Sequence, residues 1–586
     1  MHPQQSLAAE RNDVSTLVVD DADLTIENLI DVSCYDRPAA LSHEAAFIKR
    51  LADSICVVKR ALEREAPVYG VNTNFGGMAD SSISARNLSV LQHDLVWGLK
   101  CGIGRELPVQ CVRAAMLLRA HSLSKGASGI RRDLIERLLL FLNNGITPVV
   151  KDLGSLGASG DLIPLSYIAG AVTGLDRSFC VSYRGQAIDC LAALKILGLE
   201  PVQLGPKEGL ALVNGTSVST GMAAIAVYET ERLLDLSLWI NALMCIAMSA
   251  SLQPFDEFVH RMKPHHGQQQ VADTMRSLLA DESGGSPRKR AKPELVQDRY
   301  SIRCIPQYFG PLVDGLRAIT ANVGTEMNSA DDNPLIDVQR DRIVQAGNFY
   351  GQYIGIGMDQ LRQYAALIAK QLDAQIGLLV APEFSRGLPA CLAECGDEIK
   401  FGLKGLQIYL NSVLPRLLHL GNPLVMFFPT HAEQFNQNIN SQSFNAAVLA
   451  LESVTLLKYY VSAALIFAVQ GIEVRAYQYG GRYAGSDLLN GKAVTLLRAV
   501  YDVIDRAPSV EHPLVARRRD VPIDQLLARL FDDLNANHSR IFGVLSTCEG
   551  DLAGVGEAGR TREGKADLDR TSVLRHSAHS SVRLPR

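Results

Sequence analysis

Five long segments of this chain repeat apolar residues at helical spacing with few interruptions. They cover about residues 217–252, 311–328, 356–380, 398–415 and 442–473. A helix of that length and apolarity buries its surface most readily against other helices. Alternating strand patterns are short by comparison and occur at 179–183 and 335–338. The predicted fold class is therefore mainly α, a bundle of long helices joined by irregular loops.

The order of these segments predicts a division of the chain. We expect a smaller, mixed N-terminal domain over 26–215, the long-helix bundle over 216–475 and a C-terminal helical region over 476–548. The polar residues 1–25 and the Gly-, Ser- and Arg-rich residues 549–586 are expected to be flexible or disordered. The basic stretch 283–293 is expected to be a surface loop.

Helical patterns also occur in the N-terminal domain, near 41–64 and 129–142. The second pattern ends at Asn143-Asn144-Gly145, which is a good C-terminal signal for a helix.

Composition excludes several classes of function. The 586 residues carry a net charge of −4, which gives no electrostatic reason to expect a nucleic acid partner. The eleven cysteines show no metal-like pairing, so we expect reduced thiols, no metal and a cytoplasmic location. Residues 236–255 are uncharged and long enough to cross a bilayer, but they contain Asn241, Ser249 and Gln253. A buried bundle helix explains that stretch better than a membrane partner.

Three small residues in a row, Ala158-Ser159-Gly160, lie in the Gly-rich segment 154–165. Without a Cβ, the backbone nitrogen of Gly160 can bend toward the carbonyl carbon of Ala158. Ring closure followed by loss of two waters would give a methylidene-imidazolone (MIO), an electrophile that no ordinary side chain supplies. The sequence Ala127-Ser128-Gly129 repeats the tripeptide but runs directly into a helical pattern, so we interpret Ser128 as structural.

The longer pattern 154–165 resembles the MIO signature of the aromatic amino-acid ammonia-lyase and aminomutase family. The resemblance extends from about residue 20 to 545 and is greatest to bacterial phenylalanine ammonia-lyases. Further matching segments, in family order, are 66–77, 213–217, 297–303, 331–335, 347–349, 402–405 and 432–438. The resemblance implies the fumarase/aspartase-like helical bundle and a homotetramer with shared active sites. It also implies an MIO formed autocatalytically from Ala158, Ser159 and Gly160, with no metal and no diffusible cofactor.

The same resemblance assigns a role to each matching residue. Tyr69, in a glycine-punctuated lid loop, is the expected base, and its phenol pKa must be lowered by its surroundings to act near neutral pH. Tyr300 would support the cofactor or move a proton, and Arg303 offers a planar fork for the substrate carboxylate. The remaining expected binding residues are Asn214, Gln297, Asn333, Phe349, Lys404, Glu433, Asn436 and Gln437.

Two local geometries follow from these segments. A helical turn would place Gln297, Tyr300 and Arg303 at neighbouring positions, i, i+3 and i+6. Thr216 or Ser217 would act as the N-cap of the long helix that follows, whose N-terminus would stabilise negative charge at the MIO.

Substrate choice in the family follows two positions that here are Gly98 and Leu99. A histidine there accompanies tyrosine or histidine substrates, and this chain has none. Gly98 supplies neither a hydrogen bond nor bulk, so the pocket should accept an apolar ring.

The resulting hypothesis is deamination of an aromatic L-amino acid, first L-phenylalanine, to the trans-arylacrylate and ammonia. The alternatives are a 2,3-aminomutase that makes a β-aromatic amino acid, an ammonia-lyase for tyrosine or another aryl amino acid, and a non-catalytic helical scaffold. The sequence Asn72-Thr73-Asn74 after Tyr69 differs from the Thr-Ser-Gly usual in close bacterial lyases. Opening of this loop would decide whether the products leave or recombine.

Overall fold

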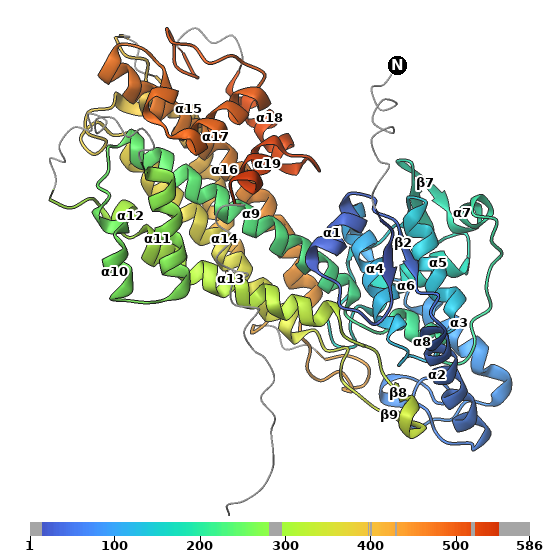
Figure 1. The fold of residues 1–586 in the computed structure, drawn as a ribbon. Coiled ribbons are helices and arrows are strands. Elements are labelled where there is room, and N and C mark those ends of the chain that lie inside the picture. Colours follow the sequence, from blue (N-terminus) through green and yellow to red (C-terminus); the bar gives the residue numbers. More distant parts are fainter. Residues whose placement is uncertain are drawn as a thin grey trace, which may run out of the picture.

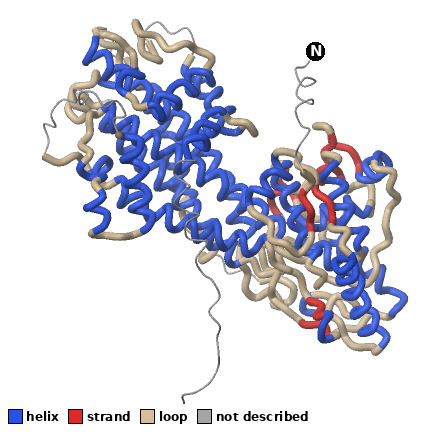
Figure 2. The backbone as a smooth tube through the Cα atoms, in the orientation of Figure 1, coloured by secondary structure: helices blue, strands red, loops and turns tan. Residues whose placement is uncertain are grey.

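The long helices predicted from apolar spacing form the body of the molecule (Figure 1). This computed structural model describes residues 15–280, 296–396, 398, 401–427, 431–516 and 522–549. Helices dominate and strands are few and short, as Figure 2 shows, so the predicted fold class is confirmed. The expected disorder at 550–586 and the expected loop at 283–293 lie outside the described residues.

The described N-terminal part of the chain, up to residue 215, contains eight α-helices. Its helices are α1 (Ile26–Cys34), α2 (Ala45–Glu63), α3 (Leu88–Gly98), α4 (Val109–Ser124), α5 (Arg132–Asn143), α6 (Leu162–Thr173), α7 (Cys190–Ile196) and α8 (Glu208–Val213). Helix α5 ends where the sequence indicated, and Gly145 takes a left-handed conformation with φ +65° just beyond it.

Short strands connect these helices. They are β1 (Leu17–Val19), β2 (Ala39–Leu41), β3 (Ile103–Glu106), β4 (Ile146–Pro148), β5 (Lys151–Leu153), β6 (Cys180–Tyr183) and β7 (Gln186–Asp189). β1 pairs with β2 in parallel, β3 pairs with β5 antiparallel, and β4, β6 and β7 form an antiparallel sheet. Leu17 and Val19 of β1 are buried, which corrects the expected flexibility of 1–25 for these residues, while 1–14 lie outside the described part.

The bundle contains the longest helices. They are α9 (Ser217–Ala247), α10 (Glu257–Arg261), α11 (His266–Leu279), α12 (Tyr300–Arg303), α13 (Ile305–Met327), α14 (Gln352–Leu379), α15 (Lys404–Leu420) and α16 (Ser443–Gly480). The C-terminal helices α17 (Gly491–Val503), α18 (Ile523–Asn535) and α19 (Arg540–Glu549) pack beside them (Figure 1). Helix α16 therefore passes the expected domain boundary at residue 475.

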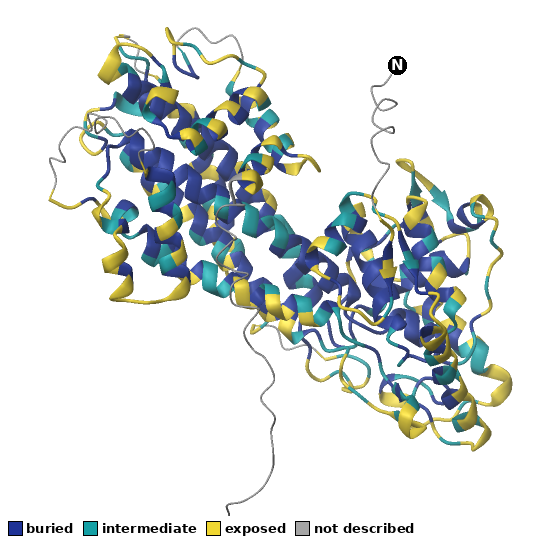
Figure 3. Cartoon of the chain, in the orientation of Figure 1, coloured by how far each residue is buried: buried dark blue, intermediate teal, exposed yellow. Residues whose placement is uncertain are grey.

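Helices α9 and α16 form the centre of the bundle. They pack against each other and against α14, and most of their residues are buried (Figure 3). Among the described residues, α16 is the one helix whose length and apolarity would suit a membrane, but the protein buries 89% of its most apolar window. The uncharged stretch 236–255 lies mostly within α9 and is likewise part of the bundle core.

One segment of the bundle returns to the N-terminal part of the chain. The antiparallel pair β8 (Leu335–Asp337) and β9 (Arg342–Val344), between α13 and α14, packs on α2. Ile336 N donates to Ala127 O at 2.8 Å. This return places Asn333 and Gly351, on either side of the strand pair, next to Asn214 and Ser443, which border the loop that carries Ala158-Ser159-Gly160.

Candidate active site

The Ala158-Ser159-Gly160 loop lies between β5 and α6, where the N-termini of α9 and α16 meet it. On the α16 side, Ser441 Oγ donates to Gly157 O at 2.7 Å. On the α9 side, Asp161 N donates to Gly215 O at 2.7 Å. Two helix N-termini directed at one loop create a positive local potential. The sequence predicted only the α9 N-terminus at this position.

The loop has room only for small residues. Gly160 has φ +68°, and a Cβ placed on it would overlap the backbone of Gly215. A Cβ on Gly157 would overlap Ser441 Oγ, and Ala158 is 5% exposed. Ser443 Oγ is buried beside the loop and has no hydrogen-bond partner among the described residues. This close surrounding, which leaves no space for larger side chains in the loop, fits the tripeptide cyclisation that an MIO requires.

Ser159 is held from two sides. Its Oγ accepts a hydrogen bond from Gln437 Nε2 at 2.9 Å, and its carbonyl oxygen accepts one from Asn214 Nδ2 at 2.9 Å. Asn214 Oδ1 in turn accepts from Asn333 N at 2.7 Å. The structure therefore brings Ser159, Asn214, Asn333 and Gln437 into one network.

Phe349 lies in the loop between β9 and α14, which meets this network on both sides of Phe349. Asn333 Oδ1 accepts from Ala346 N at 2.7 Å, which ties the loop to Asn333. Gly351, two residues after Phe349, faces Ser443 and Thr216 at the two helix N-termini.

A buried ion pair braces the turn that contacts Gly160. Arg119 Nη2 lies 2.8 Å from Asp331 Oδ1, and both side chains are almost completely buried. Arg119 Nη1 also donates to Asn214 O at 2.7 Å, while Asp331 Oδ2 accepts from Thr216 N at 2.7 Å. The pair thus fixes both sides of Gly215, which forms the wall behind Gly160.

A second buried ion pair lies one residue further along. Lys207 Nζ is 2.6 Å from Asp332 Oδ2, with both side chains fully buried. Ser128 Oγ donates to Asp332 Oδ1 at 3.0 Å. The second Ala-Ser-Gly copy is therefore a support for the segment that carries Asn333, in agreement with its structural interpretation.

The N-terminus of α9 is capped differently from the prediction. Thr216 occupies the N-cap position, but its hydroxyl donates to Glu326 Oε1 at 2.7 Å and makes no capping bond. Instead Asp161 Oδ2 accepts from Ser219 N at 2.7 Å. Burial raises the pKa of Asp161 to about 6 and that of Glu326 to about 7, although hydrogen bonds from Ser219, Ser155 and Thr216 oppose the rise.

Tyr69 lies in a loop that packs against Glu433. Its hydroxyl accepts from Gly76 N at 3.0 Å, and a Cβ on Gly76 would lie 2.6 Å from Glu433 Oε2. Burial raises the pKa of Tyr69, Glu433 raises it further, and the Gly76 hydrogen bond lowers it. This corrects the expectation that the surroundings lower that pKa: within the described chain the net direction is upward.

Glu433 and its neighbours form a tight turn over residues 432–437. Glu433, Gln434 and Phe435 have φ of 51°, 53° and 63°, a left-handed conformation that non-glycine residues adopt at a cost. Ala432 N donates to Gln437 O at 3.0 Å and closes the turn. Burial raises the pKa of Glu433, and side-chain hydrogen bonds from Asn436 and Gln437 lower it. The three predicted polar residues of this turn therefore lie together beside Ser159 and Tyr69.

The two predicted specificity positions end α3. Gly98 is exposed, and a Cβ on it would meet nothing within 4 Å. Leu99 is half-buried, just before a turn whose Gly102 packs against Leu153 and Ile163 on either side of the MIO loop.

Four predicted site residues lie at the other end of α14. Gln371 and Gln375 of α14 both donate to Ser301 O, at 2.9 and 2.8 Å. At 1.5 Å per residue, these positions lie roughly 30 Å along α14 from Gly351. Lys404 is at the same end, because Leu403 N donates to Cys391 O and Cys391 N donates to Val380 O, just beyond α14.

These four residues are largely exposed. Tyr300 is 71% exposed, Gln297 and Lys404 are exposed, and Arg303 is partly exposed. Arg303 Nη1 donates to Gln297 Oε1, and its guanidinium lies 4.6 Å from the Tyr300 ring centroid. Gln297 precedes α12, so the predicted helical turn over all three residues is wrong, although they do contact one another.

Several supporting residues were absent from the sequence prediction. Arg119, Lys207, Asp331 and Asp332 are charged residues whose burial no local pattern reveals. Ser441 and Ser443 precede and begin an apolar helix, a position that indicates only a cap. Among the described residues, no group of three or more His, Cys, Asp or Glu side chains could hold a metal ion.

The chain is similar to known proteins over most of its length. A family model described as aromatic amino acid lyase matches residues 24–499. The chain is 46% identical over 527 residues to a phenylalanine ammonia-lyase of Nostoc punctiforme, which covers 89% of this chain and 92% of that protein. It is 42% identical over 491 residues to an aromatic ammonia-lyase of Loktanella atrilutea, which covers 83% of this chain and 89% of that protein.

A solved structure of an enzyme is similar in fold to this chain. The phenylalanine aminomutase of Pantoea agglomerans has a TM-score of 0.80 at 29% identity and covers 90% of this chain and 100% of that chain. Enzymes of this kind use an MIO group. The match over most of its length makes this chain a member of the aromatic amino acid lyase family, whose members are carbon–nitrogen lyases and related enzymes.

Proposed function

We propose that this chain removes ammonia from an aromatic L-amino acid, with L-phenylalanine as the first candidate, and releases the trans-arylacrylate. The reaction breaks the Cα–N bond and removes one Cβ proton, so that a Cα–Cβ double bond forms. An MIO built from Ala158, Ser159 and Gly160 would supply the electrophile for the substrate amine.

The observation that carries this proposal is the convergence on Ser159. Asn214 and Gln437 donate to its carbonyl and hydroxyl oxygens, both at 2.9 Å. Gly215 leaves no space for a side chain at Gly160. A serine held by two amides in a loop of small residues matches what dehydration and ring closure need, because its backbone and its leaving hydroxyl are both oriented.

Tyr69 is our candidate for the base that takes the Cβ proton. Glu433 lies beside Tyr69 and would stay near the departing ammonium, whose positive charge a carboxylate stabilises. Because burial and Glu433 raise the pKa of Tyr69, a cation has to approach the phenol before it ionises near neutral pH.

We propose that a second copy of the chain supplies that cation and the carboxylate site, in a homotetramer with shared active sites. Tyr300, Gln297 and Lys404 are exposed and Arg303 is partly exposed. All four lie roughly 30 Å along α14 from the MIO loop. An arginine fork that is partly exposed in one chain is available to bind a substrate carboxylate next to the MIO loop of another.

Subunit complementation tests the shared site. We would coexpress Ser159→Ala with Arg303→Gln, two variants that are each expected to lose most of their activity. Mixed tetramers then contain some sites with both normal residues, and measurable activity should return. If mixed tetramers stay as inactive as the parents, the two residues belong to the same site within one chain.

L-phenylalanine is the first candidate because the wall at Gly98 is open and apolar. Gly98 offers no hydrogen bond, and Leu99 adds an apolar side chain. A buried phenol hydroxyl would lose its water partners there without a replacement. The 46% identical Nostoc punctiforme protein is named a phenylalanine ammonia-lyase.

A 2,3-aminomutase is the second candidate, and one observation favours it. Asn72 braces the Tyr69 loop internally, because Val68 N donates to Asn72 Oδ1 at 2.7 Å and Asn72 Nδ2 donates to Ala66 O at 2.9 Å. A loop that opens slowly would give the arylacrylate and ammonia time to recombine at the β-carbon.

Product analysis separates these functions. Incubation with phenylalanine, tyrosine, histidine and tryptophan, followed by assay of arylacrylate, β-amino acid and free ammonia, should give trans-cinnamate and ammonia from phenylalanine. Mainly β-phenylalanine with little ammonia would make the aminomutase correct. Intact-protein mass should be lower than the sequence mass by two waters, and a full sequence mass would exclude the MIO.

We also propose a cytoplasmic location. The ten cysteines within the described ranges are all free thiols, which suits a reducing compartment. Cell fractionation with activity assay of each fraction tests this, and activity confined to a secreted or membrane fraction would contradict it.

A further inference from the structure

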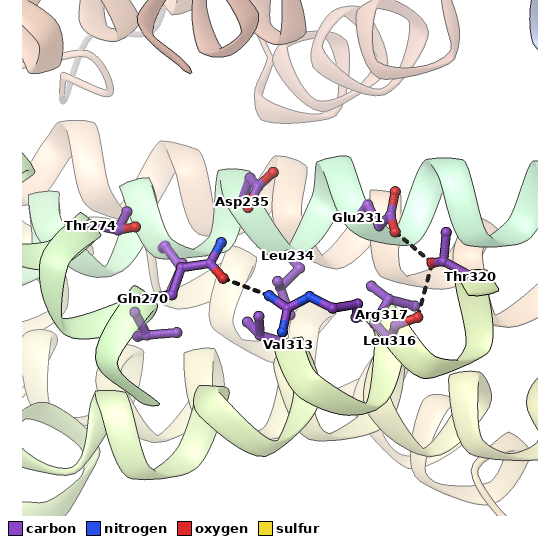
Figure 4. A pocket seen from close by; sticks show the side chains of 11 residues that line it. Glu231, Leu234, Asp235, Gln270, Thr274, Val313, Leu316, Arg317 and Thr320 are labelled. Carbon is purple, nitrogen blue, oxygen red and sulfur yellow. Dashed lines mark hydrogen bonds between the residues drawn. The ribbon is translucent and has the colours of Figure 1, made fainter. Parts of the chain in front are cut away.

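Two of the hollows on the described part of the helix bundle differ in how their charges are satisfied. The first, of about 260 Å³, lies among α9, α11 and α13 (Figure 4). Its cation, Arg317, is engaged by Gln270 at 2.9 Å and by Asp314 at 3.2 Å. The second, of about 390 Å³, lies where α1, α4, α9, α16 and the turn after α18 meet. Its charges are only partly matched.

The second hollow is separate from the MIO site. Arg232 of α9 and Lys458 of α16 both lie fifteen residues beyond the start of their helices, Ser217 and Ser443. Those helix starts hold the MIO loop, so the hollow lies roughly 22 Å further along the same two helices.

Three cations and two carboxylates line this hollow. Arg113 pairs with Asp36 at 2.9 Å and donates to backbone carbonyls as well. Lys458 pairs with Glu229 at 3.0 Å. Arg232 is the remaining cation, and within the described ranges we find no hydrogen bond or ion pair to it. The hollow therefore keeps one uncompensated positive charge.

Arg232 is nevertheless held in place. Its guanidinium lies 3.8 Å from the Phe542 ring centroid and 4.9 Å from that of Tyr228. Contact with two aromatic rings restricts the guanidinium, and its N–H groups remain able to donate to an acceptor in its plane. A planar carboxylate is the acceptor that matches two parallel N–H groups.

The other residues that line the hollow indicate which chemical groups a ligand would carry besides its carboxylate. Ile30, Val109 and Ile225 supply apolar side chains, and Asn537 and Tyr35 supply neutral polar groups. Burial is the main cause that raises the pKa of Tyr35 to about 12, so its hydroxyl stays uncharged near neutral pH. An apolar group next to one carboxylate fits this combination better than an inorganic anion, which would leave the apolar side chains unused.

We propose that this hollow is a binding site for a small organic monocarboxylate, with Arg232 as the carboxylate anchor. The inference does not depend on the proposed function, but the arylacrylate product of that function belongs to the same ligand class. The site would let such a carboxylate bind the enzyme outside the reaction centre.

The test uses the full-length protein and 4-fluorobenzoate as the probe, observed by fluorine NMR. We expect two saturable bound signals, one from the active site and one from the Arg232 hollow. Arg232→Gln should remove one signal or weaken its binding at least about tenfold, as loss of a bidentate charged pair predicts. Arg303→Gln should weaken the other signal and leave the Arg232-dependent one unchanged.

Two further variants keep the test decisive. Arg232→Lys retains the charge but loses the planar fork, so it should weaken the same signal. Val109→Trp fills the apolar wall and should exclude the probe while Arg232 is intact. Both should retain the kcat of the unaltered enzyme, which excludes a general loss of fold.

Three outcomes overturn the proposal. The first is unchanged probe binding in both Arg232 variants. The second is a single bound signal that only Arg303→Gln affects. The third is displacement of the Arg232-dependent signal by inorganic phosphate at the same concentration as the probe, because a site for any anion has no use for the apolar wall. Failure of the Arg303 arm alone would count against the proposed function and leave the hollow as proposed.

Discussion

The two ends of α14 contain two different kinds of functional surface. At the Gly351 end, Ser159 and Asn214 lie in a hydrogen-bonded network that two buried ion pairs brace. At the Gln375 end, Arg303 and Tyr300 contact each other but are largely exposed.

The comparison suggests a division of roles. One chain forms the MIO loop by itself, whereas the exposed residues need a second chain to complete a site. A backbone that must cyclise needs atoms fixed to within a fraction of an ångström, and buried contacts in one chain provide that. A carboxylate-binding arginine needs only to be presented at the right place, so a second chain can supply it. The following variants test the comparison, in order of decreasing expected effect.

Ser159→Ala should have the largest effect. Without the hydroxyl no second water can leave, so the MIO cannot form and activity should fall by at least about 10³-fold. Intact mass should show no loss of two waters, while far-ultraviolet circular dichroism stays unchanged. Ser128→Ala, in the second Ala-Ser-Gly copy, is the matched control and should keep the full mass loss. Normal activity in Ser159→Ala would refute the mechanism.

Asp331→Asn breaks the Arg119–Asp331 ion pair that supports Gly215, at the Gly351 end of α14. It leaves Arg119 buried without its carboxylate, so the free energy of unfolding should fall by about 3–5 kcal/mol. Because Gly215 loses its support, part of the protein should retain the full sequence mass. The control is Asp332→Asn, which breaks the equally buried pair with Lys207 but leaves the Thr216 and Asn214 contacts in place. Complete cyclisation in both variants would show that the Arg119–Asp331 pair is only structural.

Arg303→Gln tests the exposed residues at the Gln375 end of α14. We expect kcat/KM to fall about 10- to 100-fold through loss of a bidentate carboxylate contact, with thermal stability almost unchanged. Arg299→Gln, which removes an exposed arginine that stacks on Phe384, is the matched control and should keep full activity. A loss of stability in place of activity would place Arg303 in the structural framework.

Glu473→Gln tests whether burial in the core of the bundle keeps the carboxyl group of Glu473 in α16 protonated. Burial raises the pKa of Glu473 to about 8, while Tyr501 and Leu514 N donate to it. Between about pH 4.5 and 8 the folded state thus binds more protons than the unfolded state, and stability falls as pH rises through this window. Thermal melts should show Glu473→Gln removing a pH dependence on the order of a few kcal/mol. An unchanged pH profile would mean that Glu473 ionises normally.

Gly98→Ala should have the smallest effect. The added methyl group meets open space, so the last turn of α3 should gain about 0.5 kcal/mol at most, and KM for phenylalanine should hardly change. Gly160→Ala is the contrasting variant, because its Cβ overlaps Gly215 and cyclisation should fail. Loss of phenylalanine activity in Gly98→Ala would mean that the wall is closer to the ring than the single chain indicates.

Sequence patterns predicted most of the fold because the spacing of apolar residues indicates which helices are buried. The expected helix at 442–473 is α16, and the expected strands at 179–183 and 335–338 are β6 and β8. The pattern failed for 297–303, where three residues at helical spacing straddle the start of a four-residue helix. A short helix has too few turns for periodicity to identify it.

Candidate residues near Ser159 were also predictable, but their environment was not. Thr216 was an expected cap, yet Glu326 and Asp331 take its hydroxyl, because residues more than a hundred positions away fold against it. Burial in the folded chain raises the pKa of Tyr69, and the neighbouring Glu433 adds to the rise. No local pattern contains either contribution.

The sequence by itself determined the helical bundle, the small-residue loop and the residue types that the chemistry needs. These depend on apolar spacing and on side-chain size, which are properties of neighbours in the chain. Tertiary structure alone decided which of those residues share one site, which charges are buried in pairs and which residues are left exposed at the far end of α14. Distances and burial arise when distant segments pack together, and a linear order of residues does not contain them.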